Sequence, residues 1–115
     1  SLFGDVVKVD SMEQFISMQA SSCFMAPFYQ ALESITTWLE GENIEREKAS
    51  LFVGSLVNAF AVDAKLQGGN GFANITAESQ TPGGMNEQAL KSLQNDKAFE
   101  ALQNALTGLV QRVKK

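Results

Sequence analysis

The stretch from Ala49 to Val62 contains no charged side chain. In a helix, its apolar residues would point in every direction around the axis, and such a helix is buried in a large core or between subunits. A chain of 115 residues has little room for a large core, so the pattern favours burial in a dimer. A membrane span is the alternative, but it needs roughly 20 apolar residues. This stretch is shorter, and Gly54, Ser55 and Asn58 interrupt it.

Length, charge and residue usage narrow the class of protein. The chain is long enough for one domain, and its net charge of −4 and pI near 4.7 argue against binding nucleic acid or an anionic membrane. The absence of histidine excludes Ser-His-Asp and Cys-His catalysis. The single cysteine, Cys23, excludes an internal disulfide and a multi-thiolate metal site. We therefore expect no metal, a cytoplasmic location, and a Cys23 that is buried or half-buried.

Apolar residues recur at helical spacing along most of the chain. They predict an all-α unit of five or six helices. A short helix is expected after Ser11, a long one after Ser22 with Pro27 in its early turns, a third from about Ile44 to Leu66, one or two turns between Phe72 and Ser79, a further helix from about Met85 to Gln94, and a last helix capped by Asn95-Asp96. The carboxylates Glu33, Glu40 and Glu42 are expected on a solvated helix face or end.

The segment from Thr81 to Leu90 joins a glycine turn to the start of an amphipathic helix. Pro82 has a fixed φ, while Gly83 and Gly84 lack a Cβ and can turn their N–H groups toward a common point. The first turn of the helix adds unpaired N–H groups and the positive end of the helix dipole. This junction is suited to a carboxylate or a phosphate. The alternative is a plain connector between two helices.

The sequence Thr81-Pro82-Gly83-Gly84 resembles the Ser/Thr-Pro-Gly-Gly-x-Thr segment of the pyrroline-5-carboxylate reductase family. Upstream, 43–49 resembles that family's Gly-Leu-Pro-Arg-Glu-Glu-Ala helix start, and 89–93 and 99–113 resemble its last two helices. The resemblance implies an all-helical dimerisation domain, like the carboxy-terminal domains of that reductase and of 6-phosphogluconate dehydrogenase. In the family this domain interleaves with its twin and forms the substrate side of the active site. A separate Rossmann domain holds the cofactor.

The resemblance also implies substrate-binding residues, which are Thr81, Gly83, Gly84 and Asn86. The chain departs from the family at Met85-Asn86, because the family usually has Thr where Asn86 stands. The alternative role for Asn86 is helix N-cap, for which Asn is well suited. In a second departure, 20–24 replaces a glycine- and proline-containing loop that approaches the nicotinamide in the family. The effect of this change on cofactor approach is left open.

Two hypotheses about function follow. In the first, residues 11–115 are the dimerisation and substrate-side domain of a pyrroline-5-carboxylate reductase-like oxidoreductase. Residues 1–10 are then the stub of a missing N-terminal Rossmann domain, since the chain begins Ser1-Leu2-Phe3 and has no dinucleotide fingerprint. Such a fragment is inactive alone and holds no cofactor, whereas the full-length protein would bind NAD(P) and a small carboxylate-bearing substrate as a homodimer. In the second, the chain is a helical dimerisation module without chemistry.

Overall fold

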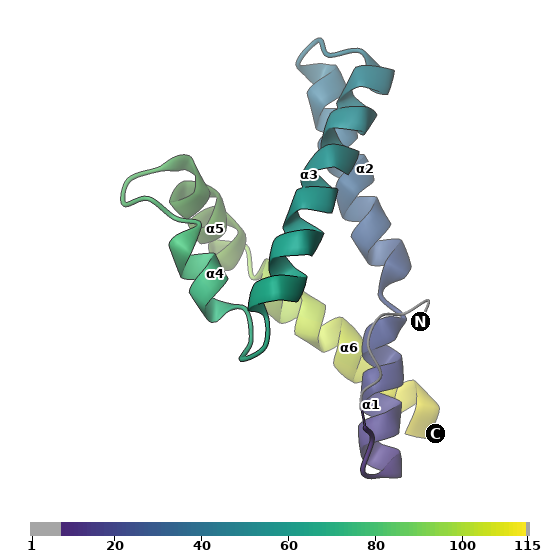
Figure 1. The fold of residues 1–115 in the computed structure, drawn as a ribbon. Helices are drawn as coiled ribbons and strands as arrows, with labels where there is room; N and C mark the ends of the chain where they lie inside the picture. The colour runs from purple at the N-terminus through teal and green to yellow at the C-terminus, as the bar shows by residue number, and fades with distance from the viewer. Residues whose placement is uncertain (1–7, 115) are drawn as a thin grey trace.

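The structure is a computed structural model of the chain and describes residues 8–114. This part consists of six α-helices and has no strand (Figure 1). The helices are α1 (Met12–Ser22), α2 (Met25–Gly41), α3 (Arg46–Gln67), α4 (Ala73–Glu78), α5 (Met85–Asn95) and α6 (Ala98–Lys114). The all-α prediction is confirmed. The expected stub at 1–10 lies mostly outside the described residues.

Local sequence signals set several of the helix ends. Ser11 caps α1, because its extended backbone lets its hydroxyl accept a hydrogen bond from the Gln14 amide at 3.1 Å. The prediction that Asn95-Asp96 caps the last helix is wrong. Asp96 is the C-cap of α5, and the chain then passes through Lys97, whose φ of 59° is left-handed, so α6 begins at Ala98. A residue of this kind at the end of a helix reverses the chain.

Helices α2 and α3 form an antiparallel hairpin that projects away from α1 and α6 (Figure 1). Asn43, with a φ of 69°, lies in the short turn that joins them. Their contact buries Thr36 on α2 and Ala49 and Val53 on α3. At the other end of the molecule α6 packs against both α1 and α5. The fold is therefore a set of helix pairs without one central core.

The single chain leaves an unusually large surface exposed. Its accessible surface is 9716 Å², whereas a folded monomer of this mass exposes about 6,200 Å². Its radius of gyration is 16.7 Å, against about 13 Å for a compact domain of this length. Helix α3 is consequently not buried all round within one chain: Phe52 is 57% exposed and Phe60 62%. Much apolar surface thus remains for something else to cover.

Helix α3 is also the one helix in the described part of the chain that is long and apolar enough to cross a membrane. The segment 46–70 has a mean hydropathy of 1.3 in its most apolar window, of which 11% is buried. The uncharged stretch from Ala49 to Val62 is too short for a span, but the segment around it is long enough, because a span tolerates an occasional charge. Core helices of proteins outside membranes meet the same criterion, so length and composition alone do not distinguish the two.

Candidate functional site

The predicted glycine turn is present. The Gly84 amide donates a hydrogen bond to the Thr81 carbonyl at 2.7 Å. Pro82 occupies the second position, and Gly83, with a φ of +75°, the third, which is the pattern of a type II turn. Gly84 is extended and forms the N-cap of α5. The turn therefore feeds directly into the helix, and it brings Thr81, Gly83, Gly84 and Asn86 into one short segment.

The backbone donors of this segment are already partly engaged. The Gly84 amide is used in the turn, and the Gly83 amide donates to Glu87 Oε1 at 3.4 Å. Lys91 Nζ lies 3.3 Å from the same carboxylate oxygen. The amides of 85–87, in the first turn of α5, have no partner within the helix by its geometry. An anion at this junction would therefore share the donors with Glu87.

Glu87 is the residue of this segment that the sequence analysis missed. A Glu three residues after a helix cap is a recognisable signal, because its side chain can reach back to an amide that precedes the helix. Its carboxylate also interacts favourably with the positive end of the α5 dipole. In this structure Glu87 therefore stands near the place where an external carboxylate was expected.

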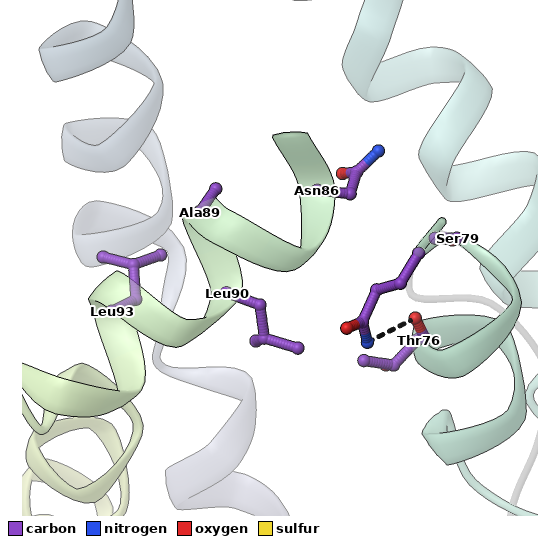
Figure 2. A pocket seen from close by; sticks show the side chains of 7 residues that line it. Thr76, Ser79, Asn86, Ala89, Leu90 and Leu93 are labelled. Carbon is purple, nitrogen blue, oxygen red and sulfur yellow. Dashed lines mark hydrogen bonds between the residues drawn. The ribbon is translucent and has the colours of Figure 1, made fainter. Parts of the chain in front are cut away.

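Asn86 is the second residue of α5, so the alternative that it caps the helix does not hold: Gly84 is the cap. Its side chain is exposed and borders an open hollow of about 200 Å³ between α4 and α5 (Figure 2). The hollow is lined by Thr76, Ser79, Gln80, Asn86, Ala89, Leu90 and Leu93. Asn86 can thus contribute both a donor and an acceptor at its edge.

The hydroxyl groups in this hollow donate to their own helix. Thr76 Oγ1 donates to the Phe72 carbonyl at 2.8 Å, and Ser79 Oγ donates to the Ile75 carbonyl at 2.7 Å. Their lone pairs remain able to accept hydrogen bonds. Leu90 and Leu93 provide apolar surface on the α5 side (Figure 2). The hollow is therefore suited to a small molecule with an apolar body and a few polar groups.

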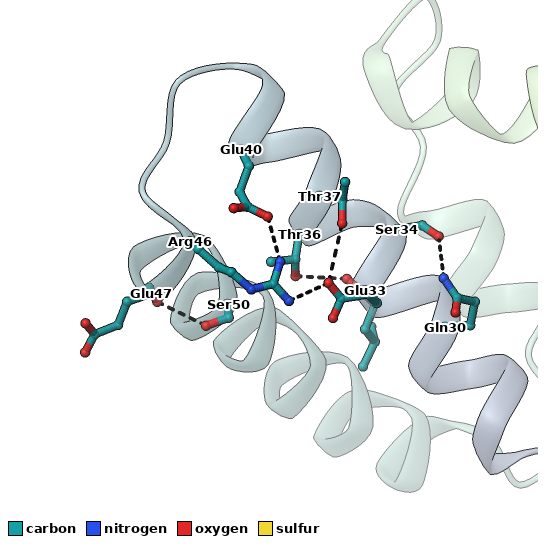
Figure 3. A network of polar contacts seen from close by, with 10 residues as sticks. Gln30, Glu33, Ser34, Thr36, Thr37, Glu40, Arg46, Glu47 and Ser50 are labelled. Atoms are coloured by element: carbon teal, nitrogen blue, oxygen red, sulfur yellow. Dashed lines mark hydrogen bonds and ion pairs between the residues drawn. The ribbon is translucent and has the colours of Figure 1, made fainter.

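A second polar cluster joins α2 to α3 (Figure 3). Arg46 Nη1 donates to Glu40 Oε1 at 2.6 Å, and Arg46 Nη2 donates to Glu33 Oε1 at 2.5 Å. The hydrogen bond from Arg46 holds the pKa of Glu33 below its ordinary value. Glu33 and Glu42 are exposed and Glu40 is half-buried, so the expected solvated helix face is confirmed for Glu33 and Glu42, and Glu33 and Glu40 are in addition paired with Arg46. The cluster links the two helices.

The segment expected to approach a cofactor is largely helical. Helix α1 continues to Ser22, so 19–22 forms its last turn and not a loop. Cys23 follows at the C-cap and is exposed, which contradicts the expectation that it is buried or half-buried. The physical reason is its position at the junction of two helices, outside the packed face of either. Among residues 8–114, no group of three or more His, Cys, Asp or Glu residues could hold a metal.

These features define the class of the protein: an all-helical domain that leaves an apolar surface uncovered and carries a glycine turn at the start of α5. Residues 12–115 match the pyrroline-5-carboxylate reductase dimerisation family. The chain belongs to this family. Comparisons with curated proteins and with solved structures found no match.

Proposed function

We propose that this chain is the dimerisation and substrate-side domain of a pyrroline-5-carboxylate reductase-like oxidoreductase. It acts in proline biosynthesis, as a homodimer, and only together with an N-terminal Rossmann domain of which 1–10 is the stub. That second domain binds NAD(P) and supplies the hydride chemistry. The helical domain contributes orientation of a small carboxylate-bearing substrate.

The uncovered apolar surface is the main observation that supports a homodimer. The chain exposes about 3,500 Å² more than a compact monomer of its mass, so two copies together have about 7,000 Å² to cover. Obligate dimers bury roughly 2,000 to more than 5,000 Å² in total, so a second copy can account for most of this excess. We further propose that a partner subunit, and not lipid, covers α3, and that the protein is cytoplasmic and binds no nucleic acid.

The substrate side is proposed at Thr81, Gly83, Gly84 and Asn86. The Thr81 hydroxyl and the Asn86 carboxamide are exposed on either side of the turn, and the first-turn amides of α5 supply positive potential. The non-catalytic module is the second candidate. It is favoured by Glu87, which engages the Gly83 amide, and by the replacement of the family's Thr with Asn86.

Two measurements test the proposal. Light scattering on the 115-residue chain should give twice 12.5 kDa, with the protein remaining in the supernatant when membranes are pelleted. The intact protein, including the sequence upstream of Ser1, should oxidise NADPH or NADH when pyrroline-5-carboxylate is added, whereas the 115-residue chain alone should not. A dimer without such activity in the intact protein would leave the non-catalytic module as the function. A stable monomer would refute both readings.

A further inference from the structure

Helix α3 has two faces with different surroundings. One face packs against α2 and carries Ala49, 1% exposed, Val53, 5% exposed, and the half-buried Val57, each four residues after the last. The opposite face carries Leu51, Ser55, Asn58 and Val62, all exposed. Spacings of four, three and four residues place these side chains along one line on the helix. We call this line the outer stripe of α3.

The outer stripe is apolar at its ends and polar in its centre. Leu51 is 69% exposed and Val62 51%, while Ser55 and Asn58 lie between them. Gly54 is one turn before Asn58, and beyond its neighbours and its own helix backbone no atom lies within 4 Å of the place where its Cβ would be. Another helix can therefore approach the backbone closely beside Asn58. The spacing of the stripe is that of a seam between paired helices.

Asn58 needs a hydrogen-bond partner once this seam is covered. Its carboxamide makes no hydrogen bond with any other residue of the described part of the chain, and burying it without one costs free energy. Ser55 differs, because a serine hydroxyl can donate to the carbonyl one turn back on its own helix. The requirement for a partner from outside the chain therefore falls on Asn58.

The excess surface of the chain identifies the occupant of the seam as a second copy, an argument that rests on the proposed homodimer. In a two-fold symmetric interface a residue near the axis faces its own counterpart. A carboxamide carries both donors and an acceptor, so two copies of it are complementary. We propose that Asn58 of one copy pairs with Asn58 of the second copy across the two-fold axis, and that this pair fixes the register of the two α3 helices.

Cross-linking tests the position of Asn58 directly. In the 115-residue chain with Cys23→Ser, which removes the native thiol, Asn58→Cys should give a disulfide-linked dimer on mild oxidation, since a disulfide requires Cα atoms within about 7 Å. Val57→Cys in the same background is the matched control. It lies one residue away but faces α2, so it should remain unlinked.

Substitution tests the role of the pair. Asn58→Asp places two like charges together and should raise the dimer dissociation constant by at least about tenfold. The same change at Asn104, an exposed position on α6, should leave it within about threefold. Asn58→Leu should keep or tighten association, because an apolar side chain in the seam needs no hydrogen-bond partner.

The outcomes separate the two ideas. If the unaltered chain is a dimer but Asn58→Cys does not cross-link, or Asn58→Asp associates as tightly as the unaltered chain, the Asn58 pair is refuted and the homodimer stands. If the unaltered chain is a monomer, the proposed homodimer fails, and the Asn58 pair fails with it.

Discussion

Arg46 Nη1 lies 2.6 Å from Glu40 Oε1, so the first residue of α3 is tied to the last turn of α2. The other terminal nitrogen of the same guanidinium contacts Glu33, two turns earlier on α2. A guanidinium can bridge two carboxylates in this way because its donors form a rigid planar fork. The contact fixes the hairpin turn at the tip of the projecting pair, beside the buried Ala49.

This contact predicts a pH dependence. The folded-state pKa of Glu33 is lowered by the hydrogen bond from Arg46, so its contribution to stability is present above the ordinary value of 4.5 and is lost as the pH falls through the folded-state pKa. Arg46→Met should lower the thermal midpoint slightly at pH 7, because exposed ion pairs contribute little, and the difference from the unaltered chain should shrink below about pH 4.5.

Circular dichroism melts between pH 7 and pH 3 measure this difference. Lys48→Met, a loss of charge in the same part of α3, is the comparison and should show no such convergence. A difference between Arg46→Met and the unaltered chain that stayed constant to pH 3 would contradict the assignment to Glu33.

Alanine at Gly83 should destabilise the fold. The φ of +75° is costly for a residue with a Cβ, and the expected loss is about 1–2 kcal/mol. Gly41→Ala is the control, since that glycine ends α2 with a negative φ and open space around it. Chemical denaturation should show a lower midpoint for Gly83→Ala only. Equal midpoints for the two variants would mean that the turn relaxes without cost.

The proposed anion site cannot be tested with Gly84→Ala. An added Cβ would lie 2.9 Å from the Thr81 carbonyl oxygen, so this variant would disturb the turn as well as any bound ligand. Glu87→Gln is the better probe of the anion site. Removing the charge weakens the hold on the Gly83 amide and raises the local potential, so the affinity of the intact protein for a proline-like carboxylate should rise by about tenfold, or roughly 1.4 kcal/mol.

Calorimetric titration checks the Glu87→Gln prediction. Lys91→Gln is its control and should weaken binding or leave it unchanged, since it releases Glu87 from an ion pair without removing the negative charge. Weaker binding by Glu87→Gln would argue that Glu87 contacts the ligand or orders the turn, and would overturn its role as a competing carboxylate.

Asn86→Thr should move the proposed substrate side toward the family's sequence. We expect a higher kcat/KM on pyrroline-5-carboxylate in the intact protein, with a change in stability of less than about 0.5 kcal/mol because the side chain is exposed and is not the cap. Gln88→Thr, a change at an exposed position two residues further along α5, is the control. Identical steady-state kinetics for both variants would remove Asn86 from the proposed site.

Phe60→Asp should abolish assembly. Phe60 is 62% exposed in the single chain, and covering a phenylalanine in a dimer contributes about 1.5–3 kcal/mol, which an unpaired buried carboxylate would replace with a penalty. Gln103→Asp on the exposed part of α6 is the comparison. Light scattering should show a monomer or aggregated protein for Phe60→Asp and a dimer for Gln103→Asp. A normal dimer with Phe60→Asp would show that α3 is not covered at this position.

The sequence by itself determined the elements that depend on neighbours along the chain. Apolar spacing located the helices, Ser11 marked the start of α1, and Pro82 with Gly83 specified the turn before α5, because helix caps and turns are decided by residues a few positions apart. It also indicated, from the uncharged stretch within α3, that one chain could not bury its own apolar surface. The resemblance carried by the glycine turn pointed to the correct family.

Only the tertiary structure decided what depends on residues far apart in the chain. Arg46 and Glu33 are separated by 13 positions, and only the α2–α3 hairpin brings them together. The sequence therefore predicted a solvated Glu33 and gave no sign of its pairing with Arg46. The left-handed backbone of Lys97 moved the start of α6, since a chain reversal depends on where two helices pack.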